Sequence, residues 1–383
     1  MTARLDAQIR FLLEADRLKS VDRANLLLDG SRPENSAEHS WHLALYALVL
    51  APLADPGVDV LRAVRMLMLH DLVEIDAGDH PIHLDHDWDA VARAEEAAAQ
   101  RLFGLLPPDQ AQALLALRAE FEAAETPTAQ FAKRLDRCQP IFQTLCADAP
   151  VAEHVDIVIG NLDGGRAASL EQEFPAAYAH AEHLLGRANA VDTSGLTQRL
   201  ALLNEADKLK LVVRASKLAD GSRRENSAEH SWHIMLFAMI LQEYAEAGVS
   251  IDRVLTMLLL HDLVEIDAGD NPIHGQVDHD AVEALEKAAA DRLFGLLPPD
   301  EGQSLRALWE EFEAAESPDA VFAKAIDRIQ VPITNLANGG GTWTEYRVTL
   351  EQLEARVGTK VSLGAPDVWD WLRPQLHAHF AVI

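Results

Sequence analysis

Histidine and aspartate side chains in the first half of the chain form a set that could bind a divalent metal ion. They come from three separate predicted helices and are His39, His70, Asp71 and Asp136. Such side chains are costly to bury in apolar helices unless they are paired or bound to a metal. A mixed nitrogen and oxygen donor set suits a divalent ion, but donor type alone does not choose the element. The sequence therefore predicts one divalent ion here and leaves Mn, Co, Fe, Ni, Zn and Mg open.

The same set recurs in the second half of the 383-residue chain. Its members are His230, His261, Asp262 and Asp327. The string HDLVEIDAGD begins at His70 and again at His261, 191 positions later, and ENSAEHSWH occurs twice at the same offset. A repeat of this length corresponds to a whole domain rather than to one unit of a solenoid. We therefore predict a tandem duplication, with a first domain at residues 1–191, a second at 192–383 and one metal ion in each.

Composition limits the classes of partner. Asp and Glu outnumber Lys and Arg by 61 to 33, which gives a formal net charge of −28 at pH 7. Duplex nucleic acid and anionic membranes both require a positive surface, so neither is expected as a partner. A small anionic substrate is compatible, because a few arginines can reverse the field within one cleft. No apolar run reaches membrane-spanning length, and we expect a cytoplasmic protein.

The apolar periodicity is helical almost throughout, and β-branched alternation is scarce. In the first half it predicts helices at about Leu5–Lys19, Ser36–Pro52, Val58–Ile75, Asp87–Leu105, Pro108–Ala124 and Thr128–Cys146. Counterparts follow 191 positions later. Ser36 and Ser227 are predicted as N-caps. The predicted fold class is all-α, with two helical bundles in tandem.

These motifs resemble the HD-domain metal-dependent phosphohydrolases. The AEHS motif, the HD doublet at His70, the E-x4-D spacing that follows it and the distant Asp136 are together similar to the 5′-deoxynucleotidase branch of that superfamily. The resemblance covers roughly residues 3–148 and 194–345. It implies an all-helical bundle in each half, and hence two tandem HD domains. It also implies that each histidine and aspartate set holds one divalent metal ion.

The resemblance assigns an acidic pair to each half. This pair would orient the attacking water and assist the leaving group; its members are Glu74 and Asp79 in the first half and Glu265 and Asp270 in the second. Glu74 lies about one helical turn after His70, so its carboxylate can reach the reaction centre.

Arginines provide the implied contacts to phosphate. Arg23 and Arg214 match the arginine that the nucleotidases use on the phosphate. The tryptophan that commonly follows it in the family is replaced by Ala24 and Ala215, so a deoxynucleotide preference does not carry over. Further anion-binding candidates lie on the loop before the first ligand helix: Arg32, Arg223 and Arg224.

The predicted function is a metal-dependent phosphomonoesterase that acts on a small phosphorylated metabolite, with a nucleoside 5′-monophosphate as the first candidate. Two alternatives stay open. Some HD-fold proteins bind two irons and act as oxygenases, which needs extra histidines; His80 and His83 could supply them in the first half, whereas the second keeps only His274. The other alternative is a non-catalytic, nucleotide-binding regulatory module, although degenerate copies usually lose ligands and both halves keep all four.

The duplication also predicts how the halves are arranged. HD nucleotidases that resemble this chain are commonly homodimers. Two fused copies can form that interface within one chain, so we expect an intrachain pseudo-dimer.

Overall fold

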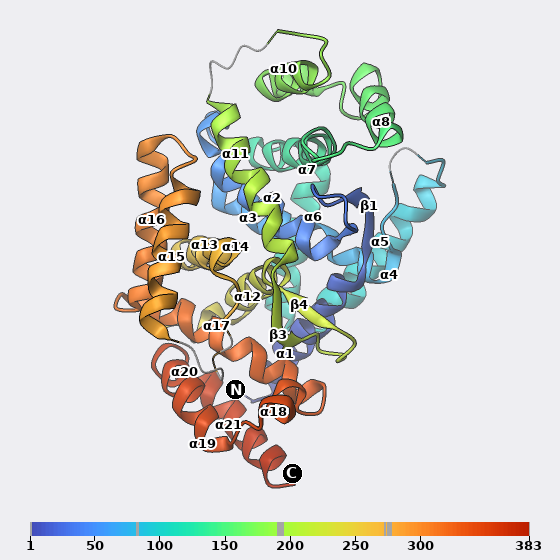
Figure 1. Ribbon diagram of the computed structural model, residues 1–383. Coiled ribbons are helices and arrows are strands. Elements are labelled where there is room, and N and C mark those ends of the chain that lie inside the picture. Colours follow the sequence, from blue (N-terminus) through green and yellow to red (C-terminus); the bar gives the residue numbers. More distant parts are fainter. Residues whose placement is uncertain (1, 82–83, 190–194, 272, 274–277, 383) are drawn as a thin grey trace.

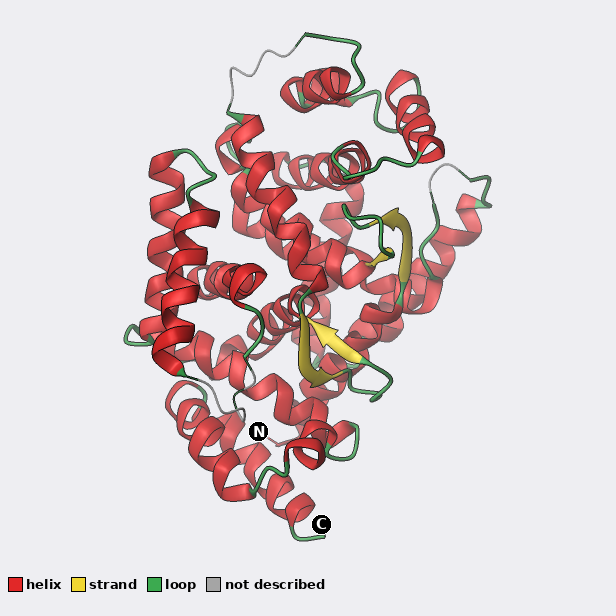
Figure 2. Cartoon of the chain, in the orientation of Figure 1, coloured by secondary structure: helices red, strands yellow, loops and turns green. Residues whose placement is uncertain are grey.

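The computed structural model describes residues 2–81, 84–189, 195–271, 273 and 278–382. Within these ranges the chain consists of helices and two short antiparallel ribbons (Figures 1 and 2). The predicted all-α class is therefore confirmed. Among the same residues, no helix combines the length and the apolar character that crossing a membrane would need.

The first half consists of helices of unequal length, of which α7 is the longest. In chain order its elements are α1 (Thr2–Ala15), η1 (Asp16–Ser20), β1 (Asp22–Leu26), β2 (Pro33–Asn35), α2 (Ser36–Val49), η2 (Ala51–Leu53), α3 (Val60–Leu69), η3 (His70–Val73), α4 (Glu74–Ala77), α5 (Trp88–Phe103), α6 (Pro108–Ala123), α7 (Pro127–Leu145), α8 (Ala152–Asp163), α9 (Leu170–Glu173) and α10 (Pro175–Leu184).

The second half repeats this order as far as α17 and then departs from it. Its elements are α11 (Leu196–Ala206), η4 (Asp207–Leu211), β3 (Val213–Lys217), β4 (Arg224–Asn226), α12 (Ser227–Leu241), η5 (Gln242–Tyr244), α13 (Ile251–Leu260), η6 (His261–Val264), α14 (Glu265–Ala268), α15 (His279–Phe294), α16 (Pro299–Ala314), α17 (Pro318–Ala337), α18 (Gly341–Tyr346), α19 (Leu350–Leu353), η7 (Glu354–Gly358), α20 (Thr359–Gly364) and α21 (Pro366–Phe380). The closing helices of the two halves lie at opposite ends of the molecule (Figure 1). The predicted boundary between residues 191 and 192 falls in 190–194, outside the described residues, and stays a prediction.

A short ribbon leads into the first ligand helix of each half. In the first half β1 pairs antiparallel with β2, with Asp22 opposite Asn35. The side chain of Asn35 accepts hydrogen bonds from the backbone N–H groups of Ala37 and Glu38, and the Glu38 carboxylate accepts one from the backbone N–H of Asn35. This capping box makes Asn35, not Ser36, the N-cap. The same correction applies to Ser227, because Asn226 caps its helix.

The two halves pack against each other through reciprocal contacts. Helix α2 lies against α12. The buried indole of Trp41 donates its Nε1–H to the carbonyl of Leu259 at 3.4 Å, and Trp232 donates to Met68 at 3.2 Å. The tryptophan contact of one half is thus repeated with the halves exchanged, which is the pattern of a twofold interface. The packing agrees with the expected pseudo-dimer.

Replacing either interface tryptophan by alanine should destabilise the protein strongly. Trp41 and Trp232 are both fully buried. Truncating a buried aromatic side chain to alanine costs roughly 3–5 kcal/mol. The free energy of unfolding, measured with urea, should fall by about this amount for Trp41→Ala and for Trp232→Ala. Trp88→Ala is the control, since Trp88 is 37% exposed and its loss should cost less than about 1 kcal/mol. Equal losses at Trp88 and Trp41 would contradict a close-packed interface.

Candidate functional site

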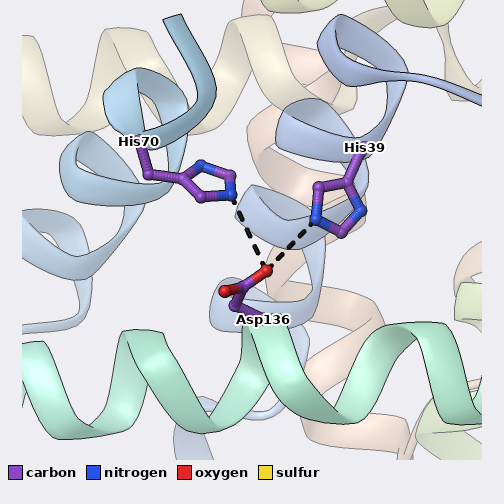
Figure 3. Close-up of side chains that lie close together, drawn as sticks. All are labelled: His39, His70 and Asp136. Atoms are coloured by element: carbon purple, nitrogen blue, oxygen red, sulfur yellow. Dashed lines mark hydrogen bonds and ion pairs between the residues drawn. The ribbon is translucent and has the colours of Figure 1, made fainter. Parts of the chain in front are cut away.

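Three predicted ligands of the first half converge on one point. His39 projects from α2, His70 from the start of η3 and Asp136 from α7, and both imidazoles point toward the aspartate (Figure 3). Asp136 Oδ1 lies 3.3 Å from His39 Nε2 and 3.7 Å from His70 Nε2. Ligand atoms bound about 2.1 Å from one ion lie roughly 3–4 Å apart. The three donor atoms therefore have the spacing of a single metal site.

The second half repeats this cluster. His230, His261 and Asp327 each offer a donor atom within 4.8 Å of the others. His230 Nε2 lies 3.2 Å from Asp327 Oδ1.

The fourth predicted ligand lies at the edge of each cluster. Asp71 Oδ1 is 3.0 Å from His70 Nε2, and Asp71 Oδ2 accepts a hydrogen bond of 2.8 Å from Arg23 Nη1. In the second half Asp262 makes the matching contacts with His261 and Arg214, both at 2.9 Å. The fourth predicted ligand thus connects each cluster to the arginine that is expected to bind phosphate.

The tautomer of His70 leaves one nitrogen lone pair facing the cluster. Nδ1 lies 2.8 Å from the carbonyl oxygen of Leu67, which can only accept, so Nδ1 carries the hydrogen. Nε2 is buried and forms no hydrogen bond with any residue that the structure describes. His261 is held in the same way by the carbonyl of Leu258 at 2.8 Å. A histidine whose second nitrogen bonds a backbone carbonyl is oriented as metal-binding histidines are.

The carboxylates of the first cluster favour a positive charge beside them. Burial lowers the pKa of His70, but the carboxylates of Asp71 and Asp136 outweigh it and raise that pKa to about 10. Burial raises the pKa of Asp136, but the interactions of its carboxylate with the imidazoles of His39 and His70 outweigh burial and hold that pKa well below its usual range. A proton on an imidazole or a divalent ion could supply the positive charge. The mixed nitrogen and oxygen donors fit the ion.

The predicted acidic pair of the first half lies beside Arg23. Arg23 Nη1 is 3.9 Å from Glu74 Oε1 and 3.8 Å from Asp79 Oδ1, and Glu74 Oε2 accepts a hydrogen bond of 2.5 Å from Ser36 Oγ. Burial raises the pKa of Glu74 well above its usual range, and Asp71 raises it further, while Arg23 opposes both effects. Burial also raises the pKa of Asp79. In both acids burial therefore favours the protonated form, while the nearby guanidinium of Arg23 favours the carboxylate.

The second half has the same arrangement. Arg214 Nη1 lies 3.8 Å from Glu265 Oε1 and 3.9 Å from Asp270 Oδ1. Ser227 Oγ donates a hydrogen bond of 2.5 Å to Glu265 Oε2.

Arg32 and Arg223 lie elsewhere, in the interface between the halves. Arg32 pairs with the buried Glu38, and its Nη2 donates to the carbonyl of Lys210 at 2.8 Å. Arg223 pairs with Glu229 in the same way and donates to the carbonyl of Lys19 at 2.6 Å. The loop turns both arginines inward because each neutralises a buried glutamate. The structure therefore does not bring them to the phosphate site that we predicted.

Arg224 also has other partners. Its side chain is paired with Glu345 at 3.0 Å and donates to the carbonyl of Ala215 at 3.0 Å. It does not line the cavity of the second half. Of the five predicted phosphate-binding arginines, Arg23 and Arg214 are the two that reach the clusters.

The cavities above the two clusters differ in size and in their far walls. The first has a volume of about 510 Å³, and the wall beyond the shared residues includes His154, Asn161 and Arg166 from α8 and the segment after it. The second has a volume of about 200 Å³ and is closed by apolar and aromatic side chains of the C-terminal helices, among them Trp343 and Tyr346. Equivalent clusters therefore open into unlike binding spaces.

Sequence reasoning missed a glutamate behind each cluster. Glu34 Oε2 lies 3.4 Å from His39 Nδ1, and Glu225 Oε1 lies 3.3 Å from His230 Nδ1. Both glutamates are completely buried. Each begins a copy of ENSAEHSWH, so the identical repeat was the available signal. A carboxylate at this position orients the histidine and increases its basicity as a ligand.

The extra histidines of the oxygenase alternative are only partly described. His80 lines the first cavity. His83 and His274 lie outside the described residues.

Comparison with known proteins places these clusters in context. The model of the HD domain family matches residues 15–178 and again residues 206–369. The 5′-deoxynucleotidase HDDC2 of Homo sapiens is 31% identical over 136 residues, a match that covers 35% of this chain and 65% of that protein, slightly less than two thirds of its length. The 5′-deoxynucleotidase hdd1 of Schizosaccharomyces pombe is 29% identical over 140 residues, which cover 35% of this chain and 69% of that protein. A predicted metal-dependent phosphohydrolase from Magnetospirillum magnetotacticum MS-1, whose crystal structure is known, is 45% identical; the match covers 49% of this chain and 95% of that one, with a TM-score of 0.46.

Proposed function

Because the chain belongs to the HD domain family, we propose that each half is a metal-dependent phosphohydrolase that cleaves a phosphomonoester. The observation that carries the proposal is the convergence, in both halves, of two histidines, two aspartates, one buried arginine and two further acids, of which the arginine and the acids line one cavity. The relatives named 5′-deoxynucleotidases support a nucleoside 5′-monophosphate as the substrate. The same names do not favour the oxygenase or the regulatory alternative.

The site residues divide into those that hold the ion and those that bind and protonate the substrate. His39, His70, Asp71 and Asp136 would hold it in the first half, as would His230, His261, Asp262 and Asp327 in the second. When bound, the ion would offset the charge of the phosphate and lower the pKa of a water that it coordinates.

The other site residues of the first half would bind the phosphate and transfer protons. The Arg23 guanidinium would bind a phosphate oxygen through a charge-assisted hydrogen bond. As water attacks phosphorus, a Glu74 carboxylate oxygen would accept the proton that the water loses. Asp79, whose pKa burial raises, would donate a proton to the leaving oxygen as its bond to phosphorus breaks. The products are inorganic phosphate and an alcohol, and Arg214, Glu265 and Asp270 would act in the same way.

The unlike cavity walls support different leaving groups for the two halves. Trp343 and Tyr346 offer the second cavity an aromatic surface on which a planar base can pack. The first cavity is larger and offers His154, Asn161 and Arg166, which suit a more polar leaving group. We assign the nucleoside monophosphate first to the second half.

Phosphate release from the full chain tests this function. Nucleoside 5′-monophosphates with ribose or deoxyribose, and a set of sugar phosphates, are each supplied with Mn²⁺, Co²⁺ or Mg²⁺. Release from at least one nucleoside monophosphate should exceed that of the His70→Ala/His261→Ala variant by at least about a hundredfold. If phosphate is released from sugar phosphates alone, the protein is still a phosphohydrolase, but the assignment of a nucleotide substrate is wrong. No release from any phosphomonoester would overturn the hydrolase itself.

A further inference from the structure

One lysine from each half is buried in the interface and is not used by the proposed mechanism. Lys210 lies in η4 of the second half, and its side chain is fully buried. Its Nζ is 2.7 Å from Glu34 Oε1, 2.9 Å from His42 Nδ1 and 2.5 Å from Asp207 Oδ1. An ammonium group has three donors, so all of its hydrogens have partners. Glu34 and His42 belong to the first half, so the second half supplies the cation that neutralises Glu34 and donates a hydrogen bond to His42.

The side chains around the ammonium group of Lys210 have donor atoms spaced as in a metal site. Glu34, His42 and Asp207 offer donor atoms within 4.8 Å of one another. His42 Nε2 lies 2.9 Å from the carbonyl oxygen of Leu203, so Nε2 carries the hydrogen and Nδ1 accepts from the lysine. Lys210 therefore serves as the permanent cation of this cluster.

From this lysine a chain of contacts leads to the metal cluster of the other half. One oxygen of Glu34 faces Lys210, and the other lies 3.4 Å from His39 Nδ1. The opposite nitrogen of His39 lies 3.3 Å from Asp136 Oδ1 in the metal cluster. The imidazole of His39 therefore faces, at ion-pair distance, a carboxylate whose other oxygen is bound by a lysine of the other half.

The same chain runs in the opposite direction. Lys19 of the first half is fully buried, and its Nζ is 2.9 Å from Glu225 Oε2 and 3.1 Å from His233 Nδ1. Glu225 Oε1 lies 3.3 Å from His230 Nδ1, and His230 Nε2 lies 3.2 Å from Asp327. Both copies of the duplicated domain therefore keep this arrangement, and in each the lysine reaches across the interface.

We propose that Lys210 and Lys19 are positioning residues for the metal site of the opposite half. Each holds a buried glutamate so that this carboxylate orients the first histidine ligand, which leaves the histidine Nε2 directed at the ion. This inference rests on the metal sites of the proposed function and adds to them a dependence between the halves: neither site is complete without the other half.

The test uses full-length protein in which a single metal site remains. His261→Ala leaves the first site, and His70→Ala leaves the second. In each background Lys210→Met and Lys19→Met are compared, and Mn²⁺ affinity is measured by counting free Mn²⁺ with electron paramagnetic resonance. Loss of a residue that orients a ligand weakens metal binding roughly tenfold to a hundredfold. Lys210→Met should do so in the His261→Ala protein and Lys19→Met in the His70→Ala protein, while each crossed combination stays within about twofold.

The two lysine variants are matched controls for each other, because they remove equivalent buried charges. General loosening of the fold would weaken Mn²⁺ binding equally in all four proteins and would overturn the proposal, as would unchanged affinity in all four. If the methionine variants do not fold, Lys210→Gln and Lys19→Gln keep an N–H donor without the charge and should give the same crossed pattern. Failure of the His261→Ala and His70→Ala proteins to bind Mn²⁺, before any lysine is changed, would instead contradict the metal assignment.

Discussion

Replacing His70 and His261 together by alanine is expected to remove all bound divalent metal and to abolish phosphate release. Each imidazole offers its cluster a buried Nε2 that has no hydrogen-bond partner within the described part of the chain. Without this imidazole, each cluster keeps a single histidine, and its carboxylates lack a compensating cation. A catalytic metal contributes several kcal/mol to transition-state stabilisation, so activity should fall on the order of a thousandfold or more.

Metal content measured by elemental analysis separates the two sites. We expect two ions per chain in the unaltered protein, one in each single variant and none in the double variant. His377→Ala is the control, since His377 is half exposed and pairs with Glu354 on the surface. Unchanged stoichiometry in either single variant would remove the metal assignment for that half.

The ligand clusters were predictable because most of their signals are local. The HD doublet at His70, the acids that follow it within ten residues and the AEHS motif lie in two short segments that occur twice. Asp136 lies far from these segments; it was predicted as an aspartate in a predicted apolar helix that recurs as Asp327, and the resemblance agreed with that prediction. The helices were predictable for the same reason, because apolar periodicity is read over one or two turns.

Contacts between the halves were not predictable from local pattern. Lys19 reads in the sequence as the basic end of an amphipathic helix, yet its partner Glu225 lies 206 positions away. Arg32 reads as a loop arginine, yet the buried Glu38 and the carbonyl of Lys210 draw it inward. When a charged residue pairs across an interface, the residues next to it in the sequence do not reveal its partner.

Short elements and chain ends were missed for other reasons. The ribbon strands Asp22–Leu26 and Pro33–Asn35 are too short to show alternation. The capping residue was misplaced by one position because Asn35 and Ser36 are both common N-caps, and Glu38 decides between them. The two cavity walls come from segments that the duplication no longer shares, so the repeat carried no information about them.

Replacing Glu74 and Glu265 together by glutamine is expected to lower phosphate release roughly a hundredfold to ten thousandfold, the range that general acid–base groups contribute. The change keeps the volume and the hydrogen bond with Ser36 or Ser227, and removes the carboxylate that accepts the proton. Each single variant should keep the activity of the other half. Substrates that prefer the aromatic cavity should lose most of their turnover with Glu265→Gln, whereas those that prefer the larger cavity should lose it with Glu74→Gln.

Metal content distinguishes a proton acceptor from a ligand. Both glutamine variants should retain two ions per chain, because neither glutamate belongs to the three-residue clusters. Asp76→Asn and Asp267→Asn are matched controls: each acid lies two positions further along the same short helix and pairs with a surface arginine, Arg101 or Arg292. These controls should leave phosphate release within about twofold. Loss of metal in the glutamine variants, or an equal loss of activity in the controls, would show that these glutamates do not act on the proton of the attacking water.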